Sequence, residues 1–541
     1  MYTEKQMNYN QLNSTFSWDE AYQAFDWNPE EKFNMGHECC DRWAEDHNRI
    51  AVYWENEFGK QVEYTFKQLR DKSNQLAHAL KSLNVKKGDR VACLLGKDIE
   101  LVVTVLATWK IGAIYVPLFT AFNSSAISYR LENVESKVLI TNHEQSKKLS
   151  TIDHSSKVIV IDNPDTPSLD FHSLINEFPV DYDVEETSLT DPCVIQFTSG
   201  STGMPKGAVY AHKILLSTYP YSKYGIAYEE GDIFMGGADP GWAYGLQNSI
   251  FNPLSFGIPI VMYKGRPNSE TYYRLMAKYN VTNFAYAPTA YRMMVQDGPE
   301  LITKHSLSVK KLSSAGEPLN AEVIRFFKKH LGITIHDHYG ATEVGMVINN
   351  YHGIAMEIKN GSMGFPTPGF TISLLDAQGN PTRDGEVGEI AIDTTNDGYY
   401  FKGYWNNEEK TAEKINGKWF LTGDLALKDE EGYYWFQGRS DDIITSSGYR
   451  IGPFEVESSL LEHPAVSEAA VVGEPDEQKG EIVKAFVVLS KHSSPSDELG
   501  EELSLHVKTN LSKHQYPRKV EFLDDLPKTT SGKIQRFKLR E

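Results

Sequence analysis

Short apolar runs alternate with helix-length segments in the first third of the chain, and this alternation limits the possible folds more than any other feature. Residues 65–83 have the periodicity of a helix, and β-rich runs follow at 90–95, 138–141 and 158–161. The same texture returns between residues 258 and 335. Strands that alternate with helices form parallel sheets covered on both faces. The sequence therefore predicts an α/β protein.

The pattern of predicted strands and helices changes twice further along the chain. From residue 371, runs such as 371–375 and 389–392 lie between Gly and Asp turns, which favours a barrel-like β subdomain. After 438–442, a compact region predicts a small α+β domain with helices at 453–461 and 499–511. We therefore expect two domains. They are a large N-terminal domain (1–440), built from two α/β subdomains and the β subdomain, and a small mobile C-terminal domain (441–541).

Composition indicates a globular protein and excludes some partners. The chain has 541 residues, 40% of them hydrophobic, and a formal charge of −19 (54 − 73). This balance argues against nonspecific binding to nucleic acid or to anionic membranes. Residues 1–20 lack an apolar signal core. The most apolar stretch, 101–119, contains Lys110, Gly112 and Pro117, which favours a buried helix that runs into a strand over a membrane span.

The four cysteines do not have the spacing of a metal site. They are Cys39, Cys40, Cys93 and Cys193, and the adjacent pair would form a disulfide only with strain. Free thiols are typical of a reducing compartment, so we predict a cytoplasmic protein.

A glycine-rich loop after a strand-like run predicts a phosphate site. The run 193–197 is apolar, and the segment 198–207 reads Thr-Ser-Gly-Ser-Thr-Gly-Met-Pro-Lys-Gly. The glycines can expose backbone N–H groups to a polyphosphate, the hydroxyls add donors, and Lys206 adds a point charge. The pattern is not a Walker motif, because Lys206 precedes Gly207 rather than Ser or Thr. The alternative interpretation is a flexible surface loop.

Five further motifs follow this loop in a fixed order. They are 315–318 (Ala-Gly-Glu-Pro), 339–343 (Tyr-Gly-Ala-Thr-Glu), 422–424 (Thr-Gly-Asp), 438–442 (Gly-Arg-Ser-Asp-Asp) with 447–450 (Ser-Gly-Tyr-Arg), and 527–533 (Pro-Lys-Thr-Thr-Ser-Gly-Lys). Each is weak alone. Together, from about residue 40 to 541, the six resemble the adenylate-forming superfamily of acyl-CoA synthetases, firefly luciferases and peptide-synthetase adenylation domains. The chain is most similar to AMP-forming acyl-CoA synthetases of the acetyl- and medium-chain branch.

The resemblance implies a two-step reaction that uses ATP, Mg²⁺ and coenzyme A. A carboxylic acid attacks the α-phosphate of ATP, and the CoA thiol then takes the acyl group. Because both first reactants are anions, positioning and charge neutralisation dominate the catalysis. The resemblance assigns Mg²⁺ to Glu343 and the ribose hydroxyls to Asp424. The ATP-binding residues that it implies are Thr198, Ser199, Gly200, Ser201, Thr202, Gly203, Lys206, Gly316, Glu317, Pro318, Asp337, His338, Tyr339, Gly340, Thr342, Asp424, Arg439, Arg450 and Lys533.

The resemblance implies that Lys533 performs the adenylation step. It also implies that Glu343, Thr198 and Lys206 are the other catalytic groups. The small domain rotates about a hinge at Asp441 and exchanges the Lys533 loop for the 447–450 face. The implied CoA path is Trp242, Ser447 and Gly448. Reversible acylation of Lys533 by a lysine acyltransferase, with a deacylase as its counterpart, is a further implication. On charge pattern alone, Lys533 is a solvated lysine.

The identity of the acid is less constrained. The resemblance implies an acyl pocket of Trp242, Ala243, Tyr244, Ala315 and Gly340. Acetate-specific relatives have Trp-Trp-x-Thr-Glu where this chain has Tyr339-Gly340, so we expect an open pocket floor and an acid longer than acetate, short and branched or of medium chain length. The alternatives are an adenylation enzyme that loads a carrier protein, an acetyl- or propionyl-CoA synthetase, and a nucleotide-binding protein without catalysis.

Overall fold

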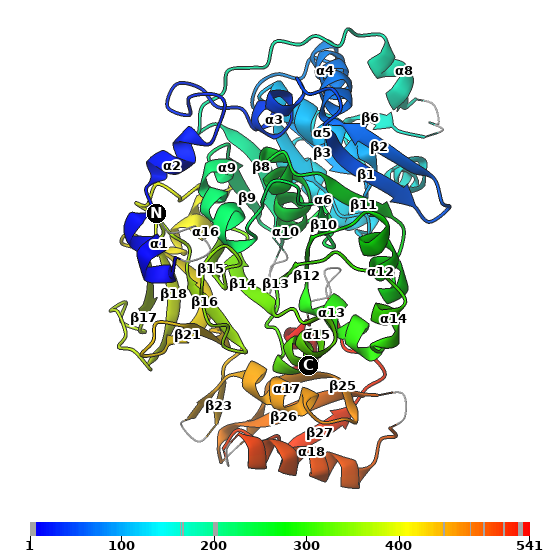
Figure 1. The fold of residues 1–541 in the computed structure, drawn as a ribbon. Coiled ribbons are helices and arrows are strands. Elements are labelled where there is room, and N and C mark those ends of the chain that lie inside the picture. Colours follow the sequence, from blue (N-terminus) through cyan, green and yellow to red (C-terminus); the bar gives the residue numbers. More distant parts are fainter. Residues whose placement is uncertain are drawn as a thin grey trace.

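A large body with two mixed sheets is joined to a small C-terminal body in the computed structural model (Figure 1). The structure describes residues 7–162, 164, 167–198, 204–446, 449–476, 478–490, 493–511, 514–528 and 534–540.

The first sheet is mostly parallel, as the alternation of strands and helices predicts. Its order is β19-β9-β8-β4-β3-β5-β6-β7, and β8 pairs antiparallel with β9. The edge strand β19 comes from much later in the chain and pairs antiparallel with β9. The strands are β3 (Arg90–Leu94), β4 (Ile114–Pro117), β5 (Val138–Thr141), β6 (Lys157–Val160), β7 (Leu169–Asp170), β8 (Pro192–Phe197), β9 (Gly207–Ala211) and β19 (Phe401–Tyr404).

The second sheet is parallel in one half and antiparallel in the other. Its order is β17-β18-β21-β22-β16-β15-β14-β13-β12-β10-β11-β1-β2, with β20 beside β21. The antiparallel strands predicted after residue 371 are present, and they join the parallel half through the antiparallel pairs β22–β16 and β16–β15. The strands are β1 (Ile50–Asn56), β2 (Gln61–Thr65), β10 (Phe234–Gly236), β11 (Ile260–Lys264), β12 (Asn283–Tyr286), β13 (Lys311–Ala315), β14 (Ile335–Ala341), β15 (Gly345–Asn349), β16 (Ser362–Pro366), β17 (Ile372–Leu375), β18 (Val387–Asp393), β20 (Ile415–Asn416), β21 (Trp419–Lys428) and β22 (Tyr434–Arg439).

Two helices show how local sequence sets the covering layer. Helix α4 (Phe66–Ser82) begins with a capping box in which the Thr65 hydroxyl accepts from the Gln68 N–H and the Gln68 side chain accepts from the Thr65 N–H. Helix α5 (Ile99–Lys110) is buried along almost its whole length and leads into β4, so the prediction of a buried helix followed by a strand is confirmed. Among the described residues, no helix has both the length and the apolar character needed to cross a bilayer.

A buried lysine joins these helices. The Lys110 ammonium is fully buried and lies 2.6 Å from the Asp41 carboxylate. It also donates to the Ser73 hydroxyl over 2.8 Å and to the Asn74 carbonyl oxygen over 2.7 Å. All three ammonium hydrogens therefore have a partner, which a buried charge requires.

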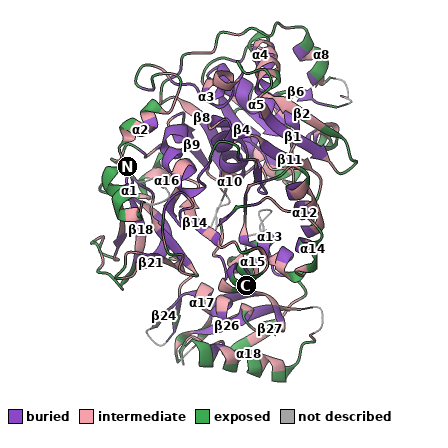
Figure 2. Cartoon of the chain, viewed as in Figure 1, coloured by how far each residue is buried: buried purple, intermediate pink, exposed green. Residues whose placement is uncertain are grey.

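The small body has a core of its own. Strands β23 (Ile444–Ser446), β24 (Tyr449–Ile451), β25 (Val466–Asp476), β26 (Gly480–Leu489) and β27 (Lys519–Phe522) form its sheet, and α17 (Pro453–Leu461) and α18 (Asp497–Asn510) pack on it. Val456, Val471, Val487 and Leu503 are buried together between these layers. Figure 2 shows the exposed face of α18 turned away from the sheet. Both predicted helices are confirmed.

Few polar contacts join the small body to the large one. The Gln296 amide donates to the Ser467 hydroxyl over 3.0 Å, and Asn320 donates to the Ser458 hydroxyl over 3.4 Å. The Phe436 and Phe454 rings meet edge to face at 6.2 Å. An interface of this kind is compatible with relative motion of the two bodies.

Replacing Lys110 by Met should destabilise the large body, because Asp41 would keep a charge without a counter-ion. We expect the free energy of unfolding to fall by about 3–5 kcal/mol, measured by urea denaturation. The control is Lys81→Met, which removes a surface pair 3.5 Å from Glu185. That change should cost less than about 1 kcal/mol. Equal losses in the two variants would contradict a special role for the buried pair.

Candidate functional site

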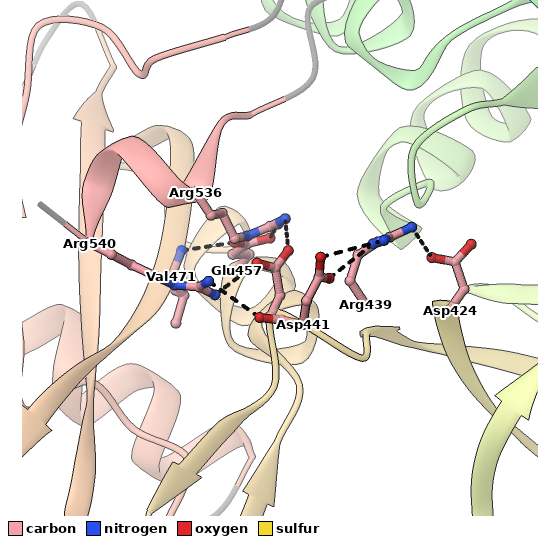
Figure 3. Close-up of polar contacts among 8 residues, drawn as sticks. Asp424, Arg439, Asp441, Glu457, Val471, Arg536 and Arg540 are labelled. Atoms are coloured by element: carbon pink, nitrogen blue, oxygen red, sulfur yellow. Dashed lines mark hydrogen bonds and ion pairs between the residues drawn. The ribbon is translucent and has the colours of Figure 1, made fainter. Parts of the chain in front are cut away.

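Four residues from three motifs meet in one network of contacts. The Tyr339 hydroxyl on β14 donates to Asp424 Oδ2 over 2.6 Å. Arg439 Nη1 lies 3.4 Å from Asp424 Oδ1, because Asp424 on β21 and Arg439 on β22 are register partners. The same guanidinium donates to Asp441 Oδ1 over 3.1 Å (Figure 3). The structure therefore brings together residues that the sequence separates by about a hundred positions.

The contacts of Asp424 with Tyr339 and Arg439 hold its carboxylate in one orientation. Burial raises the pKa of the Tyr339 phenol, and the Asp424 carboxylate raises it further. Burial alone would lower the pKa of the Arg439 guanidinium, but Asp424 and Asp441 outweigh it, and the net shift is upward. Tyr339 is thus a fixed hydrogen-bond donor and Arg439 a fixed cation. A carboxylate held from both sides is a preorganised acceptor for a pair of hydroxyls.

A second group of polar atoms lies at the ends of β13 and β14. Asp337 and Ser314 are register partners, and Asp337 Oδ1 and Ser314 Oγ are both buried. Burial is the largest influence on the Asp337 carboxyl and raises its pKa well above the usual range, against the lowering effect of hydrogen bonds from the Leu319 and His338 backbone and from the Ser314 side chain. The two side chains therefore form a buried polar pair at this edge of the sheet.

The motif 315–318 contributes backbone at the same edge. Gly316 has a φ of +98°, a left-handed conformation that favours glycine. The Glu317 carboxylate turns away from the edge to helix α13 (Pro288–Gln296), where Arg292 Nη2 lies 2.7 Å and the Thr289 hydroxyl 2.8 Å from it. The predicted contribution of Glu317 is therefore possible only through its backbone.

His338 lies on the opposite face of β14 from Asp337 and Tyr339. Its Nδ1 is 3.0 Å from the Tyr221 hydroxyl, and its Nε2 is 2.9 Å from the Asn350 carbonyl oxygen. Burial lowers the pKa of His338 to about 3 and that of its neighbour His336 to about 4. The imidazole is neutral and engaged on both nitrogens, which makes it a structural support for β14.

The phosphate segment is described at its two ends only. Thr198 and Lys206 face each other across the β8–β9 hairpin, where the Thr198 N–H donates to the Lys206 carbonyl over 2.9 Å. The predicted phosphate ligands Ser199, Gly200, Ser201, Thr202 and Gly203 lie outside the described residues. Burial lowers the pKa of Lys206, and Lys414 and Lys410 lower it further. Excess positive charge at this hairpin suits an anionic ligand.

Tyr404 connects the predicted metal ligand to this hairpin, and the sequence analysis missed it. Its hydroxyl donates to Glu343 Oε1 over 2.6 Å, and the Lys206 ammonium lies 5.1 Å from its ring centroid. Tyr404 ends β19, the strand that joins the first sheet from a distant part of the chain. No local sequence signal marks this residue, because its partners are set by the pairing of β19 with β9. The adjacent Thr342 carbonyl accepts from the Tyr400 hydroxyl over 3.3 Å.

Three of the predicted acyl-pocket residues lie at the start of α10 (Ala243–Leu246). Trp242 caps this short helix, and its ring lies 5.5 Å from that of Phe119. Ala243 is half-buried, whereas Ala315 at the end of β13 is fully buried. The Tyr244 hydroxyl is buried without a hydrogen-bond partner among the described residues. The segment thus combines small side chains with one unsatisfied hydroxyl.

Gly340 is explained by a close backbone approach. A Cβ atom at this position would lie 2.1 Å from the Gly345 carbonyl oxygen, where β14 turns back into β15. A side chain at 340 would therefore require a shift of the β14–β15 backbone, whatever ligand is bound. The missing side chain at 340 is no measure of the depth of the acyl pocket, and a Gly340→Trp change would test folding rather than specificity.

Several predicted residues of the small body can be placed only in part. Ser447, Gly448 and Lys533 lie outside the described residues, and Arg450 is placed by its backbone on β24 opposite Thr445. Asp441, the predicted hinge, directly follows β22 and Ser440 at the junction of the two bodies.

Acid should destabilise the protein through the buried histidines. When folding lowers the pKa of a histidine, that histidine stabilises the folded state fully at any pH above its pKa in the unfolded chain, which is about 6.5. This stabilisation is lost as the pH falls from about 6.5 toward the pKa of the histidine in the folded protein. Between pH 7.5 and 5.0, His338 should contribute a loss of about 2 kcal/mol. His338→Asn should flatten the pH dependence of the free energy of unfolding by that amount. Parallel curves for the two proteins would contradict this assignment.

Comparisons with known proteins identify the family of the chain. Residues 40–405 match the family described as AMP-binding enzyme, and residues 455–533 match the AMP-binding enzyme C-terminal domain. The chain is 40% identical to acetyl-coenzyme A synthetase of Bacillus subtilis (strain 168), with 98% of this chain and 94% of the relative covered. It is 35% identical to the mitochondrial acyl-coenzyme A synthetase ACSM3 of Rattus norvegicus, with 94% and 90% covered.

Solved structures give the same result. The Brucella canis acyl-CoA synthetase is 40% identical, with a TM-score of 0.80 and coverage of 99% of this chain and 98% of that one. The anthranilate CoA ligase AuaEII in complex with anthranoyl-AMP is 30% identical, with a TM-score of 0.87 and coverage of 94% and 97%. The chain therefore belongs to the AMP-binding enzyme family, and it is an AMP-forming acid–thiol ligase.

Proposed function

We propose that this ligase activates a short branched or medium-chain carboxylic acid and that the residues described above perform the two steps. In the first step an oxygen of the acid forms a bond to the α-phosphorus of ATP, and pyrophosphate leaves with the electrons of the broken P–O bond. In the second step the CoA sulfur attacks the acyl carbonyl carbon, AMP leaves, and the thiol proton is released. The observation that carries the proposal is the chain from Tyr339 through Asp424 to Arg439.

The residues of this network have chemical groups that suit the binding of ribose and adenine. Asp424, held by Tyr339 and Arg439, accepts hydrogen bonds from the two ribose hydroxyls. The buried polar atoms of Asp337 and Ser314 and the backbone at 316–318 border the adenine. A purine edge supplies both donors and acceptors to such atoms.

The hairpin of β8 and β9 holds the phosphates. Thr198 and Lys206 stand at its ends, and Glu343 reaches the same place through Tyr404. A single carboxylate with one oxygen held by a phenol fits Mg²⁺, which usually takes one or two carboxylates and completes its shell with water and phosphate oxygens. Bound Mg²⁺ would neutralise phosphate charge. Tyr404 keeps the Glu343 carboxylate oriented toward that place, and Lys206 adds positive charge beside it.

Lys533 bridges the attacking carboxylate and the α-phosphate in the first step. The small domain, residues 441–541, then turns about Asp441, and the face that carries Gly448 and Arg450 replaces Lys533. The few polar contacts between the two bodies support such a rotation. Acylation of Lys533 by a lysine acyltransferase would remove its charge and stop the first step. The buried free cysteines are consistent with a cytoplasmic location.

Two alternatives concern the substrates. The 40% identity to a protein named acetyl-coenzyme A synthetase favours acetate or propionate, whereas the identity to ACSM3 and the small residues Ala243 and Ala315 favour a longer acid. Transfer to a carrier protein instead of free CoA is the second alternative. Assays with free CoA and acids from two to twelve carbons distinguish these cases.

Lys533→Ala should abolish acid-dependent exchange of pyrophosphate into ATP and spare the conversion of supplied acyl-AMP to acyl-CoA. The expected loss is about a hundredfold or more in the first half-reaction, because the carboxylate and the α-phosphate would repel without a bridging cation. Equal losses in both half-reactions would exclude this role for Lys533.

Ala243→Leu should shift the preference toward shorter acids. Ala243 is half-buried, so the larger side chain can enter the acyl space without disrupting the core. Each excluded methylene group costs about 0.8 kcal/mol, or roughly a fourfold change in relative kcat/KM. The measurement is CoA-dependent AMP release over the series of acids. An acetate preference in the unmodified enzyme, or the same preference in both proteins, would overturn the assignment of a longer acid.

A further inference from the structure

The two ends of the segment that contains Lys533 are held together as a base. The Gln535 N–H donates to the Pro527 carbonyl over 2.8 Å, and Lys528 and Ile534 form an antiparallel bridge. These contacts place the residues just before and just after the segment 529–533 side by side. The base therefore fixes the relative position of Lys528 and Ile534, the described residues on either side of the segment.

The first side of the base is held by Lys528, whose side chain is 26% exposed and whose partners are solvent-accessible. The Lys528 ammonium lies 2.8 Å from Glu468 and 2.9 Å from Asp525. The Asp525 side chain is 76% exposed. Pairs of this kind are screened by water and contribute little to rigidity.

The second side is held by Arg536, whose side chain is 21% exposed and whose partner Glu457 is buried. Its Nη2 donates to both oxygens of Glu457 over 2.8 and 2.9 Å, and its Nε donates to Oε1 over 3.0 Å. Its Nη1 lies 3.3 Å from Asp442 Oδ2. The Glu457 side chain is only 6% exposed and also accepts from the Val471 N–H over 2.8 Å (Figure 3). One guanidinium thus connects the tail to α17, to β25 and to the start of the small body.

Asp442 and the hinge residue Asp441 are bound from different sides. Asp441 is bound by Arg439 of the large body, whereas Asp442 is bound by Arg536 and, over 2.8 Å, by Arg540 of the tail. Arg540 also donates to the Asp441 carbonyl over 3.3 Å. Two successive carboxylates therefore connect the large body and the C-terminal tail at one point.

We propose that Arg536 is a positioning residue for adenylation: it fixes the base of the Lys533 segment to Glu457 and to Asp442 next to the hinge. This role rests on the proposed function of Lys533. The contacts of Arg536 lie entirely within the small domain, so they persist when the domain turns about Asp441. The contact between Arg439 and Asp441 crosses the two bodies and changes in that motion. The base of the Lys533 segment consequently turns with the hinge as one piece.

The chemistry of Arg536 explains why another cation is a poor substitute. The guanidinium is planar and donates in several fixed directions, which lets it bind both oxygens of Glu457 and reach Asp442 at the same time. A lysine has a single charged centre and cannot bind both oxygens of Glu457 in the planar, two-pronged manner of a guanidinium while it also reaches Asp442. Replacement of Arg536 by lysine would keep the positive charge but would loosen the attachment of one side of the base.

The test compares Arg536→Lys and Arg536→Gln in the full-length enzyme. We expect acid-dependent pyrophosphate exchange to fall about tenfold in the lysine variant and about a hundredfold in the glutamine variant, because misplacement of a reacting group by about 1 Å costs this much. Conversion of supplied acyl-AMP and CoA should stay within about threefold, since the Lys533 segment is not used in that step. This retained half-reaction also establishes that the variants fold.

A double variant separates positioning from a general structural role. Arg536→Gln added to Lys533→Ala should cause no further loss of pyrophosphate exchange, because Arg536 acts only through Lys533. The control is Lys519→Gln, which removes a surface ion pair with Glu474 in the same small domain and should leave both half-reactions unchanged.

The outcomes separate the inference from the proposed function. Retention of exchange by Lys533→Ala would reject the function proposed for Lys533. If Lys533→Ala loses exchange while Arg536→Gln keeps it, or if Arg536→Gln damages both half-reactions equally, the positioning role is rejected. An additional loss in the double variant would reject it as well.

Discussion

The proposed nucleotide site depends on one carboxylate, Asp424, that is held from two sides. Tyr339 donates to one oxygen and Arg439 faces the other, and each partner comes from a different strand of the same sheet. The arrangement is possible because β21 and β22 pair in a register that places Asp424 opposite Arg439. A carboxylate fixed in this way needs no reorganisation when a ligand arrives. The same Arg439 reaches Asp441, so the site and the junction of the two bodies share one ion-pair network.

Two long-range strand pairings in the fold bring candidate site residues together. The edge strand β19 brings Tyr404 to Glu343 and Lys206, and the antiparallel half of the second sheet brings Asp424 to Tyr339. Each of these contacts joins residues that are far apart in sequence. The large body therefore builds a site for a polyanion at the meeting of its two sheets, while the small body contributes groups through a short junction. The separate core of the small body lets it remain folded as an independent unit.

Sequence patterns predicted the parts of the fold that local physics decides. Helix α17 lies at the predicted residues, and α4 and β5 follow from capping and from a short apolar run. The continuation of the parallel sheet into the antiparallel strands was not predictable, because strand pairing over long separations leaves no local signal. Gly340 is the clearest case in the site. Its sequence context suggested an open pocket floor, whereas the backbone of Gly345 occupies the space that a side chain would take.

By itself, the sequence determined the class of fold, the family and the identity of most candidate residues, since these depend on local periodicity and on motifs that recur in a fixed order. Only the tertiary structure decided which of those residues meet. It joined Tyr339, Asp424, Arg439 and Asp441 into one network, added Tyr404, and gave Arg536 its partners Glu457 and Asp442. The physical reason is that hydrogen bonds and ion pairs act over about 3 Å. Whether two side chains come that close depends on strand register and domain packing, which no single stretch of sequence encodes.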